Sequence, residues 1–279
     1  MKRAGTTLIE LMIALVVLAI FVTAMTALIL SNSRSDEDTD ARREARGVAR
    51  AAINILESEI RMAEPAGVIA PTDDSTLTFN QPFAFGIICS VAGGSTTIAL
   101  LPSADLPSSL SVDGYAGWAY RDVKGTYQYS STTSISGGSS GNCTGASPAV
   151  TPPSAGRVVQ VPSAGGETAG SVAMLYRQLT YSLRISTSMG SVPGRRGIFR
   201  TAGANGTPEE LAAPFTADAR FRWYILDDVE AEDTLPTDFA DLRGVQFVLP
   251  AQSRNTPRNE SAPATAPFTT SIFFQNRPN

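Results

Sequence analysis

The sequence has no histidine and only two cysteines among its 279 residues. Without histidine it cannot form a Ser-His-Asp or Cys-His hydrolase site, an imidazole acid–base catalyst or a histidine-ligated metal site. Two thiolates are too few for a four-cysteine zinc or iron–sulfur site. No glycine motif of the kind that cradles phosphates is present. We therefore predict that the protein is not an enzyme and has no cofactor.

Charged residues are also sparse, at 17% of the chain, and 22 basic against 26 acidic side chains leave a net charge of −4. This balance creates no overall positive field, so nucleic acid is not indicated as a partner. The length and the 43% hydrophobic content are enough for one or two domains with a sizeable core.

Charge is missing altogether from a long stretch near the amino terminus, residues 11–30. As a helix this stretch would extend about 30 Å, the thickness of the hydrocarbon core of a bilayer. Lys2 and Arg3 precede it, so the positive-inside rule predicts a cytoplasmic amino terminus and an exported remainder. We predict a single-pass membrane protein that uses residues 6–30 to cross the bilayer.

Glu10 is the one charged residue between Thr6 and Leu30. On insertion scales a carboxylate inside a membrane helix costs about 2.5–3.5 kcal/mol. In one interpretation Glu10 lies at the interface and its side chain reaches water. In the other it has a cationic partner within the membrane or within an assembly.

Gly5, Thr6 and Glu10 follow a short basic leader and precede the apolar run. This arrangement resembles the class III signal of type IV prepilins and pseudopilins, although the family usually has phenylalanine where this chain has Thr6. The resemblance implies that a prepilin peptidase cuts between Gly5 and Thr6 and methylates the new amine of Thr6. It also implies that Glu10 neutralises the terminal amine of a neighbouring subunit. The implied partners are other pilins or pseudopilins, the prepilin peptidase and the inner-membrane assembly platform.

Two other interpretations of the amino terminus remain open. The basic start, the apolar core and the small residues near Ala24 also fit an ordinary secretory signal peptide. Alternatively, the apolar run is a permanent anchor for an extracytoplasmic binding or enzymatic domain.

The helix predicted for the apolar run continues to about Glu64, because no proline or glycine interrupts it before Gly47 and Pro65 ends it. Its second half, 31–64, is amphipathic. One face carries apolar residues at spacings of three and four: Ala45, Val48, Ala49, Ala52, Ile53, Leu56, Ile60 and Ala63. Ion pairs are predicted at Asp38/Arg42, Asp40/Arg43 and Glu57/Arg61. The charged stretch Asp36–Arg50 is either a solvated face or a set of contacts between subunits.

After Pro65 the apolar period changes to two, which predicts antiparallel strands with one buried face. The clearest segments are Gln178–Ser186, Arg220–Ile225, Val245–Leu249 and Thr269–Phe274, and shorter candidates are Leu77–Phe79, Ile98–Leu101, Tyr127–Tyr129, Val158–Val161 and Ile198–Phe199. In Gln178–Ser186 the buried face should hold Leu179, Tyr181, Leu183 and Ile185. The order of strands resembles PilW-like minor pilins and J-type minor pseudopilins.

We therefore predict a pilin-like α+β fold, in which one long amino-terminal helix packs on an antiparallel β-sheet head. The expected divisions are a leader at 1–5, a membrane half of the helix at 6–30, an amphipathic half at 31–64 and a head at 65–279. Within the head, Ser130–Gly156 is rich in Ser, Thr, Gly and Pro, which predicts a long loop.

Two further features of the head carry chemistry. Cys89 and Cys143 form one disulfide if the head lies in an oxidising compartment, and are free thiols otherwise. Asp227, Asp228 and Glu230 belong to an acidic cluster that is a weak candidate for calcium, but the spacing does not match an EF-hand. A solvated connection between strands is the simpler interpretation, and we predict no metal site.

The combined prediction is a structural minor pilin of a type IV pilus, processed after Gly5. It would start in the inner membrane and move to the filament or its tip complex. The alternatives are a minor pseudopilin of a type II secretion system and a membrane-anchored extracytoplasmic domain of another function.

Overall fold

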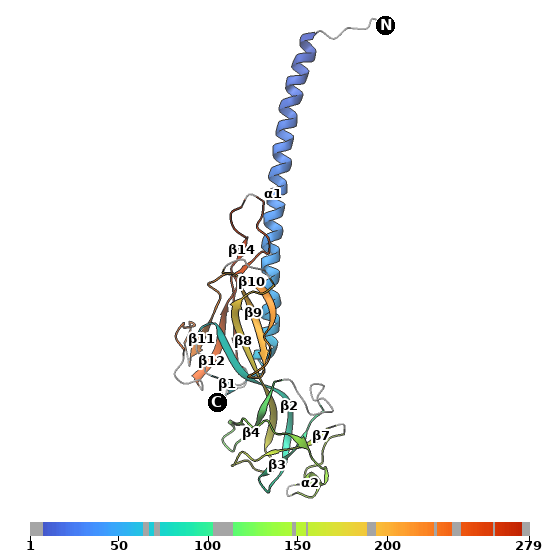
Figure 1. Cartoon of the computed structure of the whole chain (residues 1–279), viewed down its shortest axis with the longest axis vertical. Coiled ribbons are helices and arrows are strands. Elements are labelled where there is room, and N and C mark those ends of the chain that lie inside the picture. The colour runs from blue at the N-terminus through green and yellow to red at the C-terminus, as the bar shows by residue number, and fades with distance from the viewer. Residues whose placement is uncertain are drawn as a thin grey trace.

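The computed structural model describes residues 8–63, 67–69, 73–102, 114–146, 149–154, 156–188, 194–225, 228–235, 241–258 and 260–274. Figure 1 shows a long amino-terminal helix whose first half projects away from the head, while its second half lies along the strands. This helix, α1, spans Leu8–Ile60 and is about 80 Å long at 1.5 Å per residue. The arrangement confirms the predicted pilin-like α+β fold.

α1 ends earlier than predicted. The helix stops at Ile60 rather than at Glu64, and the N–H of Ala63 bonds to the carbonyl of Ile60 in a tight turn. Pro65 disfavours helical geometry in the residue before it, and helices commonly tighten in their last turn before such a stop. The helical period in the sequence does not show this final tightening.

The apolar stripe of the second half of α1 is confirmed as the face that packs on the head. Its buried members are Ala45, Ala49, Ala52, Ile53, Leu56, Ile60 and Ala63, and Val48 packs at its margin. They share one core with the strands, including Phe79, Tyr181 and Phe247. Small side chains at the start of the stripe let the helix lie close to the strands, and larger ones fill the space near its end.

The strands form two antiparallel sheets. In the described residues the larger sheet has 12 strands: β1 (Val68–Ile69), β2 (Thr76–Ala92), β3 (Ser95–Leu100), β4 (Tyr115–Arg121), β5 (Tyr127–Ser130), β6 (Ser136–Gly137), β7 (Arg157–Pro162), β8 (Val172–Ile185), β9 (Arg196–Ala202), β10 (Glu209–Phe215), β13 (Ala251–Gln252) and β14 (Thr265–Ala266). Its main order is β14-β13-β10-β9-β8-β2-β3-β7-β6, with β4 and β5 beside β8 and β1 beside β2. The smaller sheet has the order β11 (Arg220–Ile225), β12 (Leu242–Val248) and β15 (Thr269–Phe273).

All the predicted strand segments fall within or largely overlap observed strands, but two strands of full length were missed. β4 contains small residues and β10 begins with two glutamates, so neither shows a clear period of two. One predicted core residue is wrong: Ile185 is 72% exposed, because it ends β8 beyond the core that covers Leu179 and Tyr181.

The head consists of two lobes with separate cores (Figure 1). The proximal lobe (the described residues of 67–81 and 178–274) packs on α1, and the distal lobe (the described residues of 82–177) lies beyond the carboxyl end of the helix. β2 and β8 pair along most of their length and run from one lobe into the other. Their register shifts between Pro82 and Ala84, at the boundary between the cores.

The predicted loop Ser130–Gly156 is wrong in part, since it contains β6 and the short helix α2 (Gly141–Thr144). The disulfide between Cys89 and Cys143 is confirmed, with the two Cα atoms 4.7 Å apart. Both cysteines are fully buried against Ala99, in a small cluster that also touches Val150. A covalent link to β2 therefore orders a segment whose polar composition alone indicates a loop.

Candidate assembly site on the amino-terminal helix

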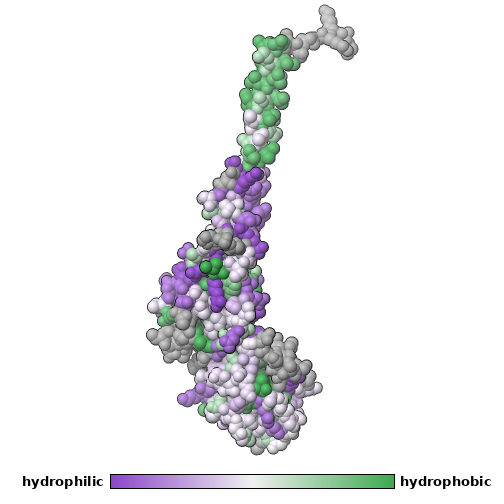
Figure 2. Space-filling view, viewed as in Figure 1, coloured by the Kyte–Doolittle hydropathy of each residue, from purple (hydrophilic) through white to green (hydrophobic). Residues whose placement is uncertain are grey.

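The first half of α1 is apolar on every side and touches no other described part of the chain. Its large apolar side chains between Leu8 and Leu30 are 50–79% exposed. Figure 2 shows this half as a continuous hydrophobic rod that changes to hydrophilic where the head begins. Within the described residues, α1 is the helix long and apolar enough to cross a membrane. Exposing so large an apolar surface to water is unfavourable, so the first half of α1 needs lipid or other apolar helices around it.

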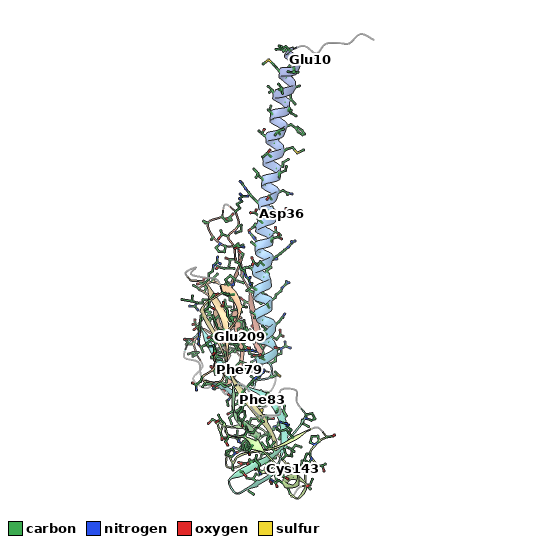
Figure 3. All side chains as sticks on the ribbon, turned by 45° about the vertical axis from the view of Figure 1, so that its right-hand side comes forward. Glu10, Asp36, Phe79, Phe83, Cys143 and Glu209 are labelled. Atoms are coloured by element: carbon green, nitrogen blue, oxygen red, sulfur yellow. A yellow bond between two sulfur atoms is a disulfide. The ribbon has the colours of Figure 1, made fainter. Side chains whose placement is uncertain are left out.

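Glu10 lies in the first turn of this rod, at its far end from the head (Figure 3). On the same side of the helix it is followed by Ile13, Ala14 and Val17. Gly5 and Thr6 lie outside the described residues, so the structure places Glu10 but not the cleavage site. The helix thus presents a carboxylate next to an apolar surface, where an isolated charge is unfavourable.

The charged stretch of α1 contains the three ion pairs that the spacing predicts. Arg42 contacts Asp38 at 3.0 Å, Arg43 contacts Asp40 at 3.2 Å, and Arg61 pairs with Glu57. All lie on the exposed side or margin of the helix, where such pairs contribute a few tenths of a kcal/mol.

Two other carboxylates of the helix bind backbone groups near the carboxyl-terminal part of the chain. Glu44 accepts a hydrogen bond from the N–H of Arg254, and Glu37 accepts one from the N–H of Arg258. These bonds attach a long connection of the proximal lobe to α1.

A network that the sequence analysis missed joins the end of α1 to the sheet. The carboxylate of Glu59 pairs with the guanidinium of Arg200 at 2.8 Å and accepts a hydrogen bond from the hydroxyl of Tyr181. Arg200 also contacts Glu209 at 3.2 Å, from the neighbouring strand. In the sequence, Glu59 adjoins the apolar stripe beside Ile60, which places a carboxylate at the edge of the buried face but does not identify its partner.

Burial and neighbouring groups shift the pKa values of two side chains in this network. Burial lowers the pKa of Arg200, but the charge and hydrogen bond of Glu59, together with Tyr181 and Glu209, outweigh this effect, so the pKa of the guanidinium lies above its usual value. Burial raises the pKa of Tyr181, and the hydrogen bond to Glu59 raises it further, so the hydroxyl stays protonated as a donor. The network therefore fixes how α1 sits on the head.

Replacing Glu59 with alanine should destabilise the helix–head contact by about 1–3 kcal/mol, since it leaves the hydroxyl of Tyr181 without its acceptor and Arg200 with only the exposed Glu209 as a partner. Glu57→Ala is the matched control, because Glu57 pairs on the helix surface with Arg61 and should cost well under 1 kcal/mol. Denaturant unfolding of the purified full chain in detergent measures both. An equal decrease in the free energy of unfolding of the two variants would show that the network contributes nothing beyond a surface ion pair.

The described residues of the acidic cluster do not form a metal site. Asp227 lies outside the described residues, while Asp228 and Glu230 are exposed. Asp233, farther along, pairs with Arg220 at 3.2 Å and with Arg222 at 2.9 Å. Among the residues that the structure describes, no group of three potential ligands is close enough to hold a metal ion.

The geometry defines a class of protein: a long helix with a free apolar half, an acidic residue in its first turn and a β-sheet head packed on the other half. The family model of the prokaryotic N-terminal methylation motif matches residues 1–26, which include the leader, Glu10 and most of the apolar run. The chain is therefore prepilin-like at its amino terminus. No curated protein and no solved structure matches it.

Proposed function

We propose that this protein is a minor pilin of a type IV pilus, cut by prepilin peptidase between Gly5 and Thr6 and methylated on Thr6. Residues 6–30 then anchor it in the inner membrane and later join the filament core, while 31–64 and 65–279 form the amphipathic half and the head. The observation that carries this proposal is the exposed apolar half of α1 with Glu10 in its first turn. Lipid can surround the apolar surface but does not stabilise a charged carboxylate. An array of such helices provides both an apolar environment and, at each processed amino terminus, an ammonium group that can pair with Glu10.

The proposed role of Glu10 is to pair with the terminal amine of a neighbouring subunit. Cleavage creates an ammonium next to hydrocarbon, and burying either charge alone is unfavourable. Joining the filament relieves both charges at once, so charge pairing drives assembly without catalysis. The partners in this scheme are other pilins, the peptidase and the inner-membrane assembly platform.

Mass spectrometry of the native amino terminus tests the proposal. A chain that begins with methylated Thr6 supports it. A chain that begins with Met1 indicates a permanent anchor for a domain of another function, and one that begins after about Ala24 indicates a secreted protein.

A second assay separates a pilus from a secretion pseudopilus. Filaments sheared from the cell surface should contain the protein, and deletion of its gene should reduce piliation but not protein secretion. If secretion falls and piliation is unchanged, the protein is instead a minor pseudopilin of a type II secretion system.

A further inference from the structure

The exposed surface of α1 carries two charged pairs of opposite sign. Asp36 and Asp40 are one helical turn apart, and Arg46 and Arg50 are also one turn apart. All four are exposed, and Asp36 is labelled on the helix in Figure 3, at the level where the head begins. At about 100° per residue, the acidic pair lies opposite the apolar stripe that includes Ala45, Ala49 and Leu56, whereas the basic pair lies on the flank of that stripe. Both pairs are therefore accessible to a neighbouring chain.

These four side chains form few interactions within the described chain. Asp36, Arg46 and Arg50 make no ion pair or side-chain hydrogen bond with any described residue, and Asp40 makes only an exposed contact with Arg43. Charges elsewhere on the same helix do find partners, such as Glu44 and Glu59 in the head.

The acidic pair of one α1 helix and the basic pair of a second, parallel α1 helix match in spacing when the two helices are shifted along their axes by one particular distance. Ten residues separate Asp36 from Arg46, and ten separate Asp40 from Arg50, which is about 15 Å along the axis at 1.5 Å per residue. A parallel second helix shifted by this amount places both acids of one copy level with both bases of the other. The acidic and basic pairs lie about 80° apart around the axis, so each copy offers one face to the copy above and another to the copy below. Contacts of this head-to-tail kind produce open helical arrays.

Gly47 provides an independent indication of a close neighbour. Glycine in the interior of a helix weakens it, yet Gly47 is exposed, and no atom lies within 4 Å of where a Cβ would be. Nothing in the fold of the described chain requires a glycine there. A bare helix surface beside the charged pairs allows a second backbone to approach closely.

We propose that Asp36 and Asp40 of one copy pair with Arg46 and Arg50 of a second copy of this chain, displaced by about 15 Å along the helix axis. This inference rests on the proposed function, because it assumes that the chains assemble. Copies level with one another in a membrane keep the two pairs farther apart than the Debye length of about 8 Å, so the contact forms only when subunits are staggered. Exposed ion pairs are weak, and their role here is to select the register of assembly.

This displacement differs from the one that pairs Glu10 with a neighbour's amine. Thr6 and Glu10 are four residues apart, about 6 Å along a helix, against about 15 Å for the charged pairs. The two contacts therefore join different neighbours in a helical array.

Cysteine cross-linking in sheared filaments tests the register. The two native cysteines are bonded to each other, so each engineered chain has one free thiol. Asp36→Cys and Arg46→Cys are placed on two differently tagged copies in one cell, with Asp36→Cys and Asn54→Cys as the mismatched control. We expect a cross-linked dimer of the two tagged chains at least tenfold above the control, since a disulfide needs Cβ atoms about 4 Å apart. Retaining Asp40 and Arg50 leaves one charge pair to hold the contact.

Charge reversal tests the energetic role. The double variant Asp36→Arg/Asp40→Arg should lower incorporation into filaments at least threefold, and adding Arg46→Asp/Arg50→Asp to the same chain should restore it to within a factor of two. Cleavage at Thr6 and retention of the disulfide serve as folding controls for each variant.

The possible outcomes separate this inference from the proposed function. If filaments contain the protein but show no matched cross-link, cross-link only to another subunit, or tolerate the reversal, the second-copy contact is wrong and the proposed function stands. If the wild-type chain keeps Met1 and enters no filament, the proposed function itself fails.

Discussion

Changing Glu10 to glutamine is expected to reduce the amount of the protein in filaments more than tenfold, while cleavage after Gly5 continues. Glutamine has nearly the same size and removes only the charge, so the variant isolates the ion pair with the neighbouring amine. Pairing must offset a cost of about 2.5–3.5 kcal/mol for a carboxylate in a membrane helix, and a tenfold change corresponds to about 1.4 kcal/mol. Quantitative immunoblots of sheared filaments and of membranes measure both effects.

Glu37→Gln is the matched control for this prediction. Glu37 lies on the same helix but outside the apolar half, where it accepts a hydrogen bond from the N–H of Arg258. This variant should assemble at nearly the wild-type level. Normal assembly of Glu10→Gln would mean that the carboxylate reaches water at the membrane surface and has no role in docking.

Removing the disulfide by Cys89→Ala/Cys143→Ala is expected to destabilise the distal lobe by about 4 kcal/mol, in line with the entropy of closing a loop of this length. The bond spans a sequence separation of 54 residues and holds α2 against β2 and β3. Because the two lobes have separate cores, the proximal lobe should keep its stability. Hydrogen exchange of the full chain in detergent distinguishes amides of β3 and β7 from those of β9 and β12.

Reduction of the wild-type protein with dithiothreitol is the matching control and should produce the same pattern of exchange. A uniform increase in exchange throughout both lobes would contradict the separation of the cores. A change of less than 1 kcal/mol would show that packing around Ala99 and Val150 holds this segment without the covalent bond.

The parts of the structure that follow a regular period were predictable from the sequence. The apolar stripe from Ala45 to Ala63 identifies the buried face of α1, because spacings of three and four place those residues on one side. Alternation likewise identifies β11, β12 and β15. The acid–base spacing on α1 also predicts the three local ion pairs.

What could not be predicted depends on contacts between distant residues. Glu59 and Arg200 are 141 residues apart, and no local pattern indicates that they meet. The division into two lobes depends on where β8 changes partner from β9 to β4, which is a property of pairing rather than of composition. The role of Gly5, Thr6 and Glu10 stays a prediction, because Gly5 and Thr6 lie outside the described residues and no partner chain is present.

The distal lobe is one continuous stretch of chain, 82–177, which leaves the proximal lobe along β2 and returns to it along β8. At the crossing point Gln81 pairs with Arg177, whose guanidinium donates a 2.7 Å hydrogen bond to the amide oxygen of Gln81. The core that packs on α1 therefore lies entirely on one side of this Gln81–Arg177 pair, and the distal core lies on the other side. We therefore expect changes within the distal core to leave intact the helix surface on which polymerisation would depend, so that assembly places few demands on the far end of the molecule.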